Sequence, residues 1–529
     1  MSDARRGGLG VALRLQLRTG WVSLAVWVGA LVATYAATVS AIDSTYPTPE
    51  LLQTYGDTIG SDPALAAING TPYGATTLGG VAANEFGFIA AIAVPLLGLL
   101  LVTRGTRAQE ESGLLELLRS RSVGPRAPWL AALIVAFGVL VLVGLGIVAS
   151  LLAYGVGLDD AGLYALSIVG LGAVFASLAT FVGQLVRRGS DVIGVGLLVL
   201  GASYVLRAIG DVKDNGWKWL SPLAWQQESR AFADDQRWWP LLLAYGTAAT
   251  LVGAGLALVV RRDLGSALVP SRPGPGRASR PLARPIGLAV RGHGPSIVAW
   301  ALGAATVGAV FGIFTDDIAE VINANPSLAD VFGNGSAGGA TDWYVSFVLV
   351  LVVLMAIGCA AQGIGRIRDE ETAGRLEPVL ASSVPRVRWL GVHSATVVLG
   401  ACVVGLAGGA GLAAVVAGST GGGGGGVLHA SVEYLPTVLV IGAFGVLLVG
   451  ALPRATAAIW AAIAYVALVE LLGETLSLPE WMRSISPLHA IGRLPIEAAN
   501  GSAIAWLCAV TVGLVVAGLV GFRRRDVPR

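Results

Sequence analysis

A short charged segment occurs twice in the chain. Residues 107–116, RAQEESGLLE, return as residues 368–377, RDEETAGRLE, with the arginine, a glutamate, the glycine, a leucine and the last glutamate at the same spacing. Each copy follows a long apolar run, and each is followed by Pro-Arg and then by Trp-Leu. We call the surrounding segments, 105–127 and 366–388, the repeated elements. Their residue types offer ion pairs and apolar contacts rather than covalent or redox chemistry.

Nucleotide hydrolysis within this chain is not expected. A phosphate-binding loop needs Gly-x-x-x-x-Gly-Lys followed by Ser or Thr. The chain's lysines are Lys213, which follows Val212, and Lys218, which follows Trp217, and the glycine run 421–426 contains no lysine. We therefore expect no cofactor in this chain and interpret the glycine run as a flexible connector.

Other enzyme classes lack their motifs as well. The histidines, His293, His393, His429 and His489, are isolated in the sequence and none has the spacing of a metal site. No Gly-x-Ser-x-Gly nucleophile motif occurs where a strand, turn and helix could form. The sequence predicts no catalytic and no metal-binding residue, and structural or interfacial roles for the histidines.

The composition is that of a membrane protein. Hydrophobic residues make up 55% of the 529 residues and charged residues 13%, whereas soluble domains have about 25% charged residues. The mean hydropathy is +0.73. A net charge of +2 argues against a nucleic-acid partner, which requires a concentrated basic surface. The cysteines lie inside apolar runs, so no disulfide framework is expected.

The elements that must position these segments are membrane-spanning helices, each of which needs about 20 apolar residues. We expect an all-α polytopic protein with twelve spans, six before and six after the middle of the chain. The spans are predicted at about 20–41, 86–104, 129–154, 161–186, 191–209, 239–260, 296–315, 344–364, 390–418, 435–453, 455–472 and 503–522.

The basic residues predict the orientation. Most of the 35 arginines and lysines fall in the termini and in alternate loops, whereas 43–85 and 316–342 contain none. Because cytoplasmic loops are enriched in Lys and Arg, both termini are predicted to be cytoplasmic, and so are both repeated elements.

Further short motifs that occur twice indicate a tandem duplication. Ser221-Pro222-Leu223 returns as Ser486-Pro487-Leu488, and Arg261-Arg262-Asp263 returns as Arg524-Arg525-Asp526. An even number of spans per half makes the halves parallel repeats. The predicted domains are a basic interfacial segment at 1–19, a first six-span half at 20–262, a basic Pro/Gly linker at 263–291 and a second half at 292–529. A second interfacial helix is expected at 286–291.

Each repeated element is predicted to be a turn followed by a short helix. Gly113 and Gly374 can end the preceding helix in the left-handed conformation. Leu115 and Leu118 then lie three residues apart on one helix face. Such a helix, with an apolar face and exposed acids, suits docking onto another protein. A helix lying on lipid headgroups is the alternative, although an anionic inner leaflet would repel the glutamates.

The pattern Glu-x-Gly-x-Leu-Glu-Leu-Leu at residues 111–118, between spans 2 and 3, resembles the coupling helix of bacterial type-2 ATP-binding-cassette (ABC) permeases. The two fused halves further resemble actinobacterial polyketide-antibiotic and multidrug exporters. The resemblance implies that each helix inserts into a cleft of a cytoplasmic ATPase. By this resemblance the ATPase-coupling residues are Glu110, Glu111, Gly113, Leu115, Glu116, Leu118, Glu371, Gly374, Leu376, Glu377, Pro378 and Leu380. Pro378 departs from the family pattern, so the second helix is expected to start near Glu377.

The resemblance also implies a function: a permease subunit in the bacterial plasma membrane that exports hydrophobic or amphiphilic compounds, antibiotics among them. ATP and Mg would be bound by two copies of the ATPase subunit, or by two related subunits. Spans 2, 5, 8 and 11 would line the pathway, with candidate residues Phe88, Tyr204, Phe347, Met355, Trp460 and Tyr465. For each of these residues, packing between helices is the competing explanation.

Two other functions fit the topology. A twelve-span proton-coupled efflux carrier also has parallel halves, but the Asp-Arg-x-Gly-Arg type motif of such carriers is missing between spans 2 and 3. A membrane scaffold or sensor would leave the paired acidic elements unexplained. Arg207 and Glu470 are the clearest ionisable residues inside or near spans, and a structural ion pair or extension of the side chain to the membrane interface is favoured over a proton relay.

Overall fold

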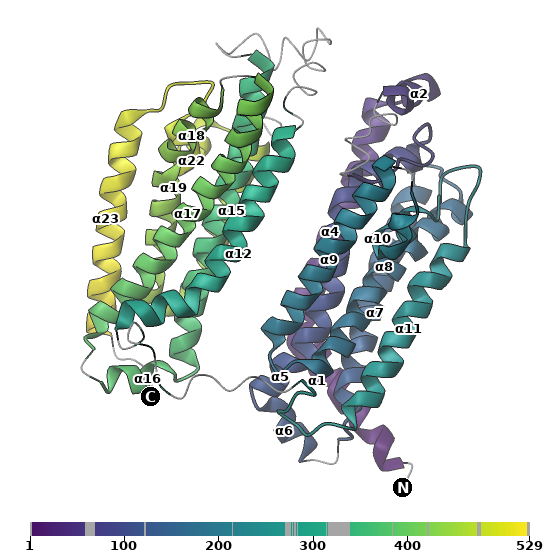
Figure 1. The fold of residues 1–529 in the computed structure, drawn as a ribbon, viewed down its shortest axis with the longest axis horizontal. Coiled ribbons are helices and arrows are strands. Elements are labelled where there is room, and N and C mark those ends of the chain that lie inside the picture. Colours follow the sequence, from purple (N-terminus) through teal and green to yellow (C-terminus); the bar gives the residue numbers. More distant parts are fainter. Residues whose placement is uncertain are drawn as a thin grey trace. The chain divides into compact units, whose positions relative to one another are not determined.

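The computed structural model describes residues 3–58, 69–120, 123–213, 215–269, 277, 279, 282, 284–313, 315, 339–382, 384–420, 423–472 and 478–525, which contain helices and no strand. The chain divides into two compact units, Met1–Gly274 and Pro275–Arg529. The boundary falls inside the segment 263–291 that the sequence predicts as a linker. Each unit is considered by itself below (Figure 1).

The first unit contains long helices joined by short ones. Its elements are α1 (Asp3–Thr45), α2 (Pro49–Thr58), α4 (Leu78–Gly105), α5 (Arg107–Glu111), α6 (Leu114–Arg119), α7 (Ala127–Leu152), α8 (Leu158–Leu185), α9 (Gly189–Lys213), η1 (Gly216–Leu220), α10 (Pro222–Gln227) and α11 (Trp239–Val259). The short helices α5 and α6 lie at one end of the unit, and α2 and α10 lie at the other (Figure 1).

The second unit repeats this arrangement. Its elements are α12 (Pro285–Ile313), α15 (Gly339–Thr372), α16 (Leu376–Leu380), α17 (Arg386–Thr420), α18 (Gly424–Glu433), α19 (Leu435–Ala451), η4 (Pro453–Ala455), α20 (Ala458–Leu472), α21 (Glu480–Arg483), α22 (Pro487–Ile491) and α23 (Gly501–Arg524). The helix α16 lies at the opposite end of this unit from α18 and α22 (Figure 1).

The predicted all-helical membrane fold is confirmed. Within the described residues, 11 helices are long and apolar enough to cross a membrane, and Ala458–Leu471 forms a shorter apolar helix at the position of the remaining predicted span. The helices extend beyond the apolar runs because polar residues at their ends continue the backbone hydrogen bonding. The orientation of the termini stays a prediction.

Local predictions at three places need correction. The basic stretches at 1–19 and 286–291 do not form separate interfacial helices, because α1 begins at Asp3 and α12 at Pro285 and both continue without a break. The glycine run predicted as a flexible connector contains the start of α18 at Gly424; residues 421–422 lie outside the described part. Residues 59–68 and 316–338, within the two segments that contain no basic residue, also lie outside it.

Corresponding helices pack in the same pairs in both units. In the first unit α1 packs on α7, α4 on α8, and α8 on α11; in the second unit α12 packs on α17, α15 on α19, and α19 on α23. Small residues permit close approach of such helices. A Cβ atom on Gly98 of α4 would lie 2.5 Å from the carbonyl oxygen of Gly172 of α8. The duplication seen in the sequence is therefore also a duplication of packing.

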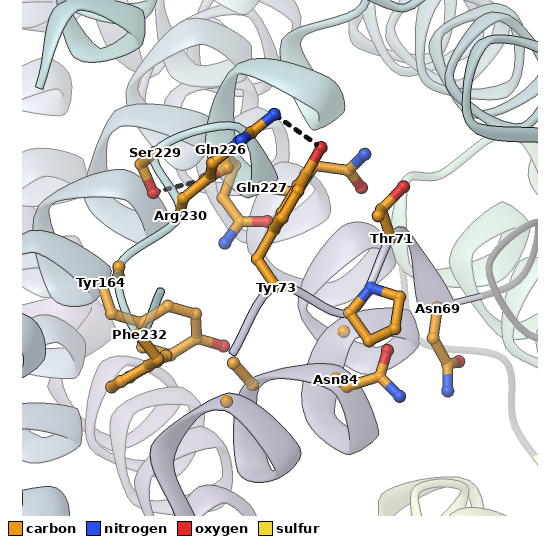
Figure 2. Close-up of a pocket in the computed structure, with 15 residues that line it drawn as sticks. Asn69, Thr71, Tyr73, Asn84, Tyr164, Gln226, Gln227, Ser229, Arg230 and Phe232 are labelled. Atoms are coloured by element: carbon orange, nitrogen blue, oxygen red, sulfur yellow. Dashed lines mark hydrogen bonds between the residues drawn. The ribbon is translucent and has the colours of Figure 1, made fainter. Parts of the chain in front are cut away.

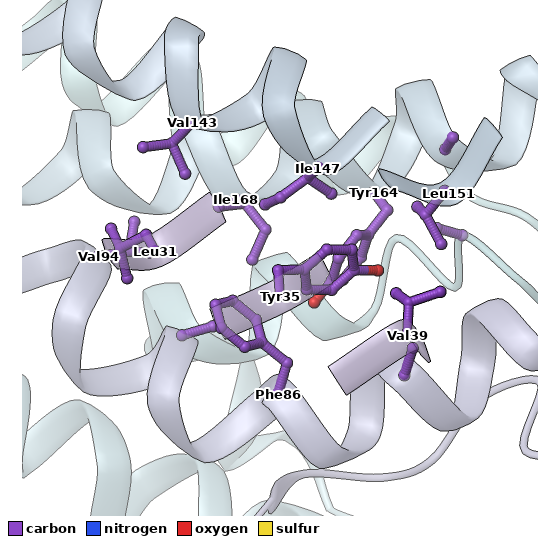
Figure 3. Close-up of a cluster of buried hydrophobic side chains, with 14 of the residues drawn as sticks. Leu31, Tyr35, Val39, Phe86, Val94, Val143, Ile147, Leu151, Tyr164 and Ile168 are labelled. Atoms are coloured by element: carbon purple, nitrogen blue, oxygen red, sulfur yellow. The ribbon is translucent and has the colours of Figure 1, made fainter. Parts of the chain in front are cut away.

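The core of the first unit is built around stacked aromatic rings. The ring of Tyr35 meets that of Phe86 edge-on at 5.0 Å and stacks on that of Tyr164 at 5.8 Å. All three side chains are buried, together with Ile147 and Leu151 of α7 (Figure 3). This core joins α1, α4, α7 and α8, and so fixes the helix that leads into the first repeated element.

Candidate functional site: the repeated elements

Both repeated elements contain the predicted turn. Gly113 has φ of 76° and Gly374 has φ of 70°, so both adopt the left-handed conformation, which confirms the expected caps. At neither glycine would an added Cβ atom meet anything within 4 Å. The backbone conformation, rather than space, therefore explains glycine at these two positions.

A short helix follows each turn. In the first element it is α6, which begins at Leu114; in the second it is α16, which begins at Leu376 and is one residue shorter. The start of α16 agrees with the effect predicted for Pro378, which occupies its first turn, where a missing N–H costs no helical hydrogen bond.

The apolar residues of these helices are oriented differently from the sequence prediction. Leu115 is 2% exposed and Leu376 1% exposed, so both side chains pack into their own units rather than facing outward. Leu118 and Leu380 are half-buried, and Pro378 is exposed. The last glutamate of each copy, Glu116 or Glu377, is exposed.

The outward faces of the two helices differ. In α6, Leu114 is 37% and Leu117 69% exposed on either side of Glu116. In the second element the same positions hold Arg375, the residue before α16, which pairs with Glu370 at 3.0 Å, and Pro378 within α16. An acid is thus presented in both units, flanked by leucines in one and by arginine and proline in the other.

Glu110 and Glu371, which occupy equivalent positions in the two copies, are each buried in an ion cluster. In the first unit, Arg262 donates hydrogen bonds from Nη1 to Oε1 of Glu110 at 2.6 Å and from Nη2 to Oε2 at 2.8 Å. Arg107 Nη1 lies 3.1 Å from Oε2, and the backbone N–H of Gly265 donates to Oε1 at 2.7 Å. The carboxylate thus has a partner at each oxygen, and its side chain is 3% exposed.

The second unit contains the equivalent cluster. Arg525 Nη2 lies 2.7 Å from both carboxylate oxygens of Glu371, and Arg368 Nη1 lies 2.7 Å from Oε2. The side chain of Glu371 is 2% exposed. The repeated arginines, at 107 and 368 and at 262 and 525, are visible in the sequence. The contacts of Arg262 with Glu110 and of Arg525 with Glu371 are not, because 152 and 154 residues separate the partners.

Glu111, the acid next to Glu110 in the first element, also has a partner within the chain. Glu111 accepts a hydrogen bond from the backbone N–H of Gly189 at the start of α9. Glu110, Glu111 and Glu371 therefore have partners within the chain, and of the acids predicted for partner contact, Glu116 and Glu377 face outward.

Two of the histidines that lie far apart in the sequence form a buried pair, which fits the structural role predicted for them. His293 Nε2 lies 3.2 Å from His393 Nδ1, with both side chains 6% exposed. The pair joins α12 to α17, and the ring of Trp389 lies 4.7 Å from that of His393. Sequence spacing could not show this, because the residues are 100 positions apart. The described residues contain no group of three or more potential metal ligands.

The structure brings together part of the predicted pathway set. In the first unit Phe88 of α4 meets Tyr204 of α9 edge-on at 6.4 Å, and the guanidinium of Arg207 lies 4.6 Å from the centre of the Tyr204 ring. Arg207 is 2% exposed and lies 3.9 Å from the carboxylate of Asp211.

The second-unit candidates are more dispersed. Phe347 stacks on Trp343 at 6.1 Å, and Tyr465 donates to the carbonyl of Met482. Met355 is half-buried, whereas Trp460 is 52% exposed. Glu470 accepts a hydrogen bond from Ser486 at 2.8 Å. Arg207 and Glu470 therefore each have a polar partner in their own unit.

The other end of the first unit contains a charged network that sequence reasoning missed. Glu228, whose side chain is 0% exposed, pairs with Lys218 at 2.7 Å and with Arg230 and Arg237 at 3.3 Å, and accepts from Tyr73 at 2.7 Å. Burial opposes ionisation, but the hydrogen bonds from Lys218 and Tyr73 prevail and lower the pKa of Glu228. Burial and the bond to Glu228 raise the pKa of Tyr73 to about 12.

A cavity of about 40 Å³ lies beside this network, large enough for a few water molecules. Figure 2 shows Tyr73 and Arg230 at one side and Tyr164 and Phe232 at the other. The only advance signal for this region is the charge-rich and Trp-rich composition of 210–238.

The fold and the repeated elements define a multi-pass membrane protein of the permease type, and comparisons with known proteins identify the family. The description "ABC-2 family transporter protein" applies to a family model that matches residues 32–223. A model of the C-terminal domain of the multidrug efflux system permease Rv1217c matches residues 282–523. The chain is 33% identical to the multidrug efflux system permease protein Rv1217c of Mycobacterium tuberculosis (strain ATCC 25618 / H37Rv), over 98% of this chain and 95% of that protein. The chain therefore belongs to the ABC-2 family of transporter permeases.

Proposed function

We propose that this chain is the permease subunit of a multidrug exporter and that its repeated elements couple it to a separate cytoplasmic ATPase. The observation that carries the proposal is the presence, in both units, of a left-handed glycine followed by a short helix that presents an exposed glutamate. The name of the mycobacterial relative, a multidrug efflux system permease, supports the cargo class. ATP and Mg are bound by the partner, and this chain supplies no catalytic group.

The chemistry of the exposed faces indicates what the partner must offer. Glu116 flanked by Leu114 and Leu117 fits a cleft with an apolar wall and a basic or amide group. Glu377 beside Arg375 and Pro378 fits a more polar cleft. Two ATPase subunits bind, one at each element, and the contact at α6 is the stronger because it buries more apolar surface.

The cargo is held by apolar burial rather than by charge. The candidate contacts, Phe88 and Tyr204 in the first unit and Phe347 and Met355 in the second, are aromatic or thioether side chains that are at least partly accessible. Such side chains adapt to ligands of different shape. Movement of the ATPase subunits changes the access of this pathway and releases the cargo outside the cell.

The decisive experiment reverses both exposed glutamates. Glu116→Arg together with Glu377→Arg places like charges against the partner's basic groups, where losing a close charge pair costs about 2–5 kcal/mol. We expect the double variant to insert normally but to lose ATPase co-purification and drug-stimulated hydrolysis, with the single change at Glu116 having the larger effect. Asp263→Arg, an exposed acid beside the first element, is the matched control and should retain the partner.

Two results would contradict the proposal. If α6 and α16 lie on anionic lipid instead, the added arginines strengthen that contact and do not disturb binding of the ATPase. Unchanged co-purification in the double variant would therefore remove the coupling assignment. Transport that continues without any ATPase partner and stops with a proton uncoupler would favour the secondary carrier.

A further inference from the structure

In each unit, one ion cluster links the repeated element to the last long helix, α11 in the first unit and α23 in the second. We propose that Glu110 with Arg262, and Glu371 with Arg525, are positioning residues that pass movement of the repeated element directly to α11 and to α23. The inference rests on the proposed coupling function and adds the route by which partner movement enters each helix bundle.

The connectivity of the clusters supports this route. Glu110 belongs to α5, which leads through Gly113 into the exposed helix α6, and Arg262 lies three residues beyond the end of α11. In the second unit Glu371 lies at the end of α15, just before Gly374, and Arg525 is the cap residue of α23. Each cluster thus joins the base of a docking helix to the inner end of a candidate membrane span.

The first cluster also includes α8. Arg262 Nε donates to the side-chain oxygen of Gln184 at 2.7 Å, and Leu268 and Val269 donate backbone hydrogen bonds to the carbonyls of Gln184 and Leu185. Because α8 packs on both α4 and α11, displacement of α5 acts on α8 and α11 together.

The geometry is that of a rigid joint. The Arg262 guanidinium binds both carboxylate oxygens of Glu110 through separate nitrogens, a bidentate arrangement that fixes direction as well as distance. The charged side chains Arg107, Glu110 and Arg262 are at most 4% exposed. Water therefore competes little with the bonds of the first cluster. In the second cluster Glu371 is 2% exposed, whereas Arg525 and Arg368 are 16% and 21% exposed.

Stability alone is a poor explanation for the clusters. Buried ion pairs are often replaceable by apolar residues without loss of stability, because removing charges from water offsets their attraction. Yet Arg, Glu and Arg occur in both units in the same roles, while neighbouring exposed positions differ, with leucines at 114 and 117 and arginine and proline at 375 and 378. The shared feature is a directional link, which apolar packing does not supply.

The test separates coupling from partner binding. Glu110→Gln together with Glu371→Gln removes the charges while keeping side-chain size, and leaves Glu116 and Glu377 intact. In proteoliposomes with the co-purified ATPase we expect normal partner binding and continued ATP hydrolysis. The number of dye molecules exported per ATP should fall at least about tenfold, because charge-assisted bonds contribute more than the free energy that a tenfold change represents.

Two further variants control for structural effects. Arg262→Lys with Arg525→Lys keeps the charges but removes the two-nitrogen contact of Arg262 and the planar guanidinium of Arg525, and should give an intermediate ratio of transport to hydrolysis with the fold retained. Asp263→Asn, an exposed neighbour, should leave this ratio unchanged.

An unchanged ratio in either double variant, with or without a lower melting temperature, would overturn the inference. If the glutamine variant does not fold, the lysine variant decides. Failure of the proposed coupling function would be visible separately, as absence of the ATPase from the unmodified protein.

Discussion

Replacing Glu228 with glutamine should destabilise the first unit strongly. The carboxylate is fully buried and is the shared partner of Lys218, Arg230 and Arg237. Removing one partner of a buried ion pair costs about 3–5 kcal/mol because the other charge is left without compensation. The side chain of Arg237 is 33% exposed, so water can solvate its charge after the change. The free-energy cost therefore comes mainly from the charges of Lys218 and Arg230, whose side chains are 11% and 18% exposed.

The assay is thermal unfolding of the detergent-solubilised protein, followed by intrinsic tryptophan fluorescence. At about 2 °C per kcal/mol for large domains, the expected decrease in melting temperature is about 6 °C or more. The control is Asp235→Asn, which also removes an acid paired with Arg230 and Arg237 but at a side chain that is 56% exposed. A surface pair contributes about 0–1 kcal/mol, so a decrease of at most about 2 °C is expected.

The same network predicts a pH dependence. Because the pKa of Glu228 is lowered in the folded state from its ordinary value of 4.5, its contribution is present above that value and is lost as pH falls through the folded pKa. Melting temperature should therefore fall below about pH 4.5 in the unmodified protein, and less steeply in Glu228→Gln. Equal melting temperatures for the Glu228 and Asp235 variants, or parallel acid profiles, would refute this account of the network.

Three other outcomes are expected. Gly113→Ala with Gly374→Ala forces a side chain into the left-handed region at a cost of about 1–2 kcal/mol per site; with open space at both Cβ positions, the protein should fold but recover less ATPase in pull-downs. In a background without the native cysteines, a cysteine at His429 should react with impermeant thiol reagents in intact cells, and cysteines at Ser120 and Ser382 should not; external labelling of Ser120 would contradict the orientation. The purified chain alone should hydrolyse ATP no faster than an empty-detergent control, as a phosphate-release assay can show.

The helices were predictable because a membrane-spanning segment has a long and uniform apolar signature. Local exceptions arose where two influences compete. Gly424 begins α18 although a glycine run favours a connector, because helix ends are stabilised by packing: a Cβ atom on Gly424 would lie 2.7 Å from the carbonyl oxygen of Ala413. The continuous α1 likewise follows from helix propagation, in which each added residue gains a hydrogen bond once the helix exists.

The candidate site was predictable in its backbone but not in its contacts. The spacing of Gly113 and the following leucines was enough to predict a turn and a helix. The side of that helix that faces inward was not predictable. Leu115 and Leu118 share one helix face whether that face packs inward or binds a partner, and only tertiary packing decides between the two. Arg107 and Arg368, three residues before Glu110 and Glu371, are near in sequence, but the other arginine partners, Arg262 and Arg525, lie more than 150 residues away along the chain. No local pattern distinguishes an acid reserved for a partner from one bound by a distant arginine.

The duplication itself supplies the comparison that separates these roles. Two copies of one element within a chain share a fold and a membrane, so positions that keep both residue type and contact in each copy serve the common architecture. Glu110 and Glu371 meet this condition, as do Leu115 and Leu376, and all four side chains are buried. Exposed positions that differ between copies, such as Leu117 and Pro378, respond to something outside the unit. Glu116 and Glu377 are exposed and yet identical, a combination that architecture does not require and that the proposed binding of one class of partner would explain. Reversal of these glutamates and neutralisation of the buried ones should therefore give different defects, loss of the partner in one case and loss of coupling in the other.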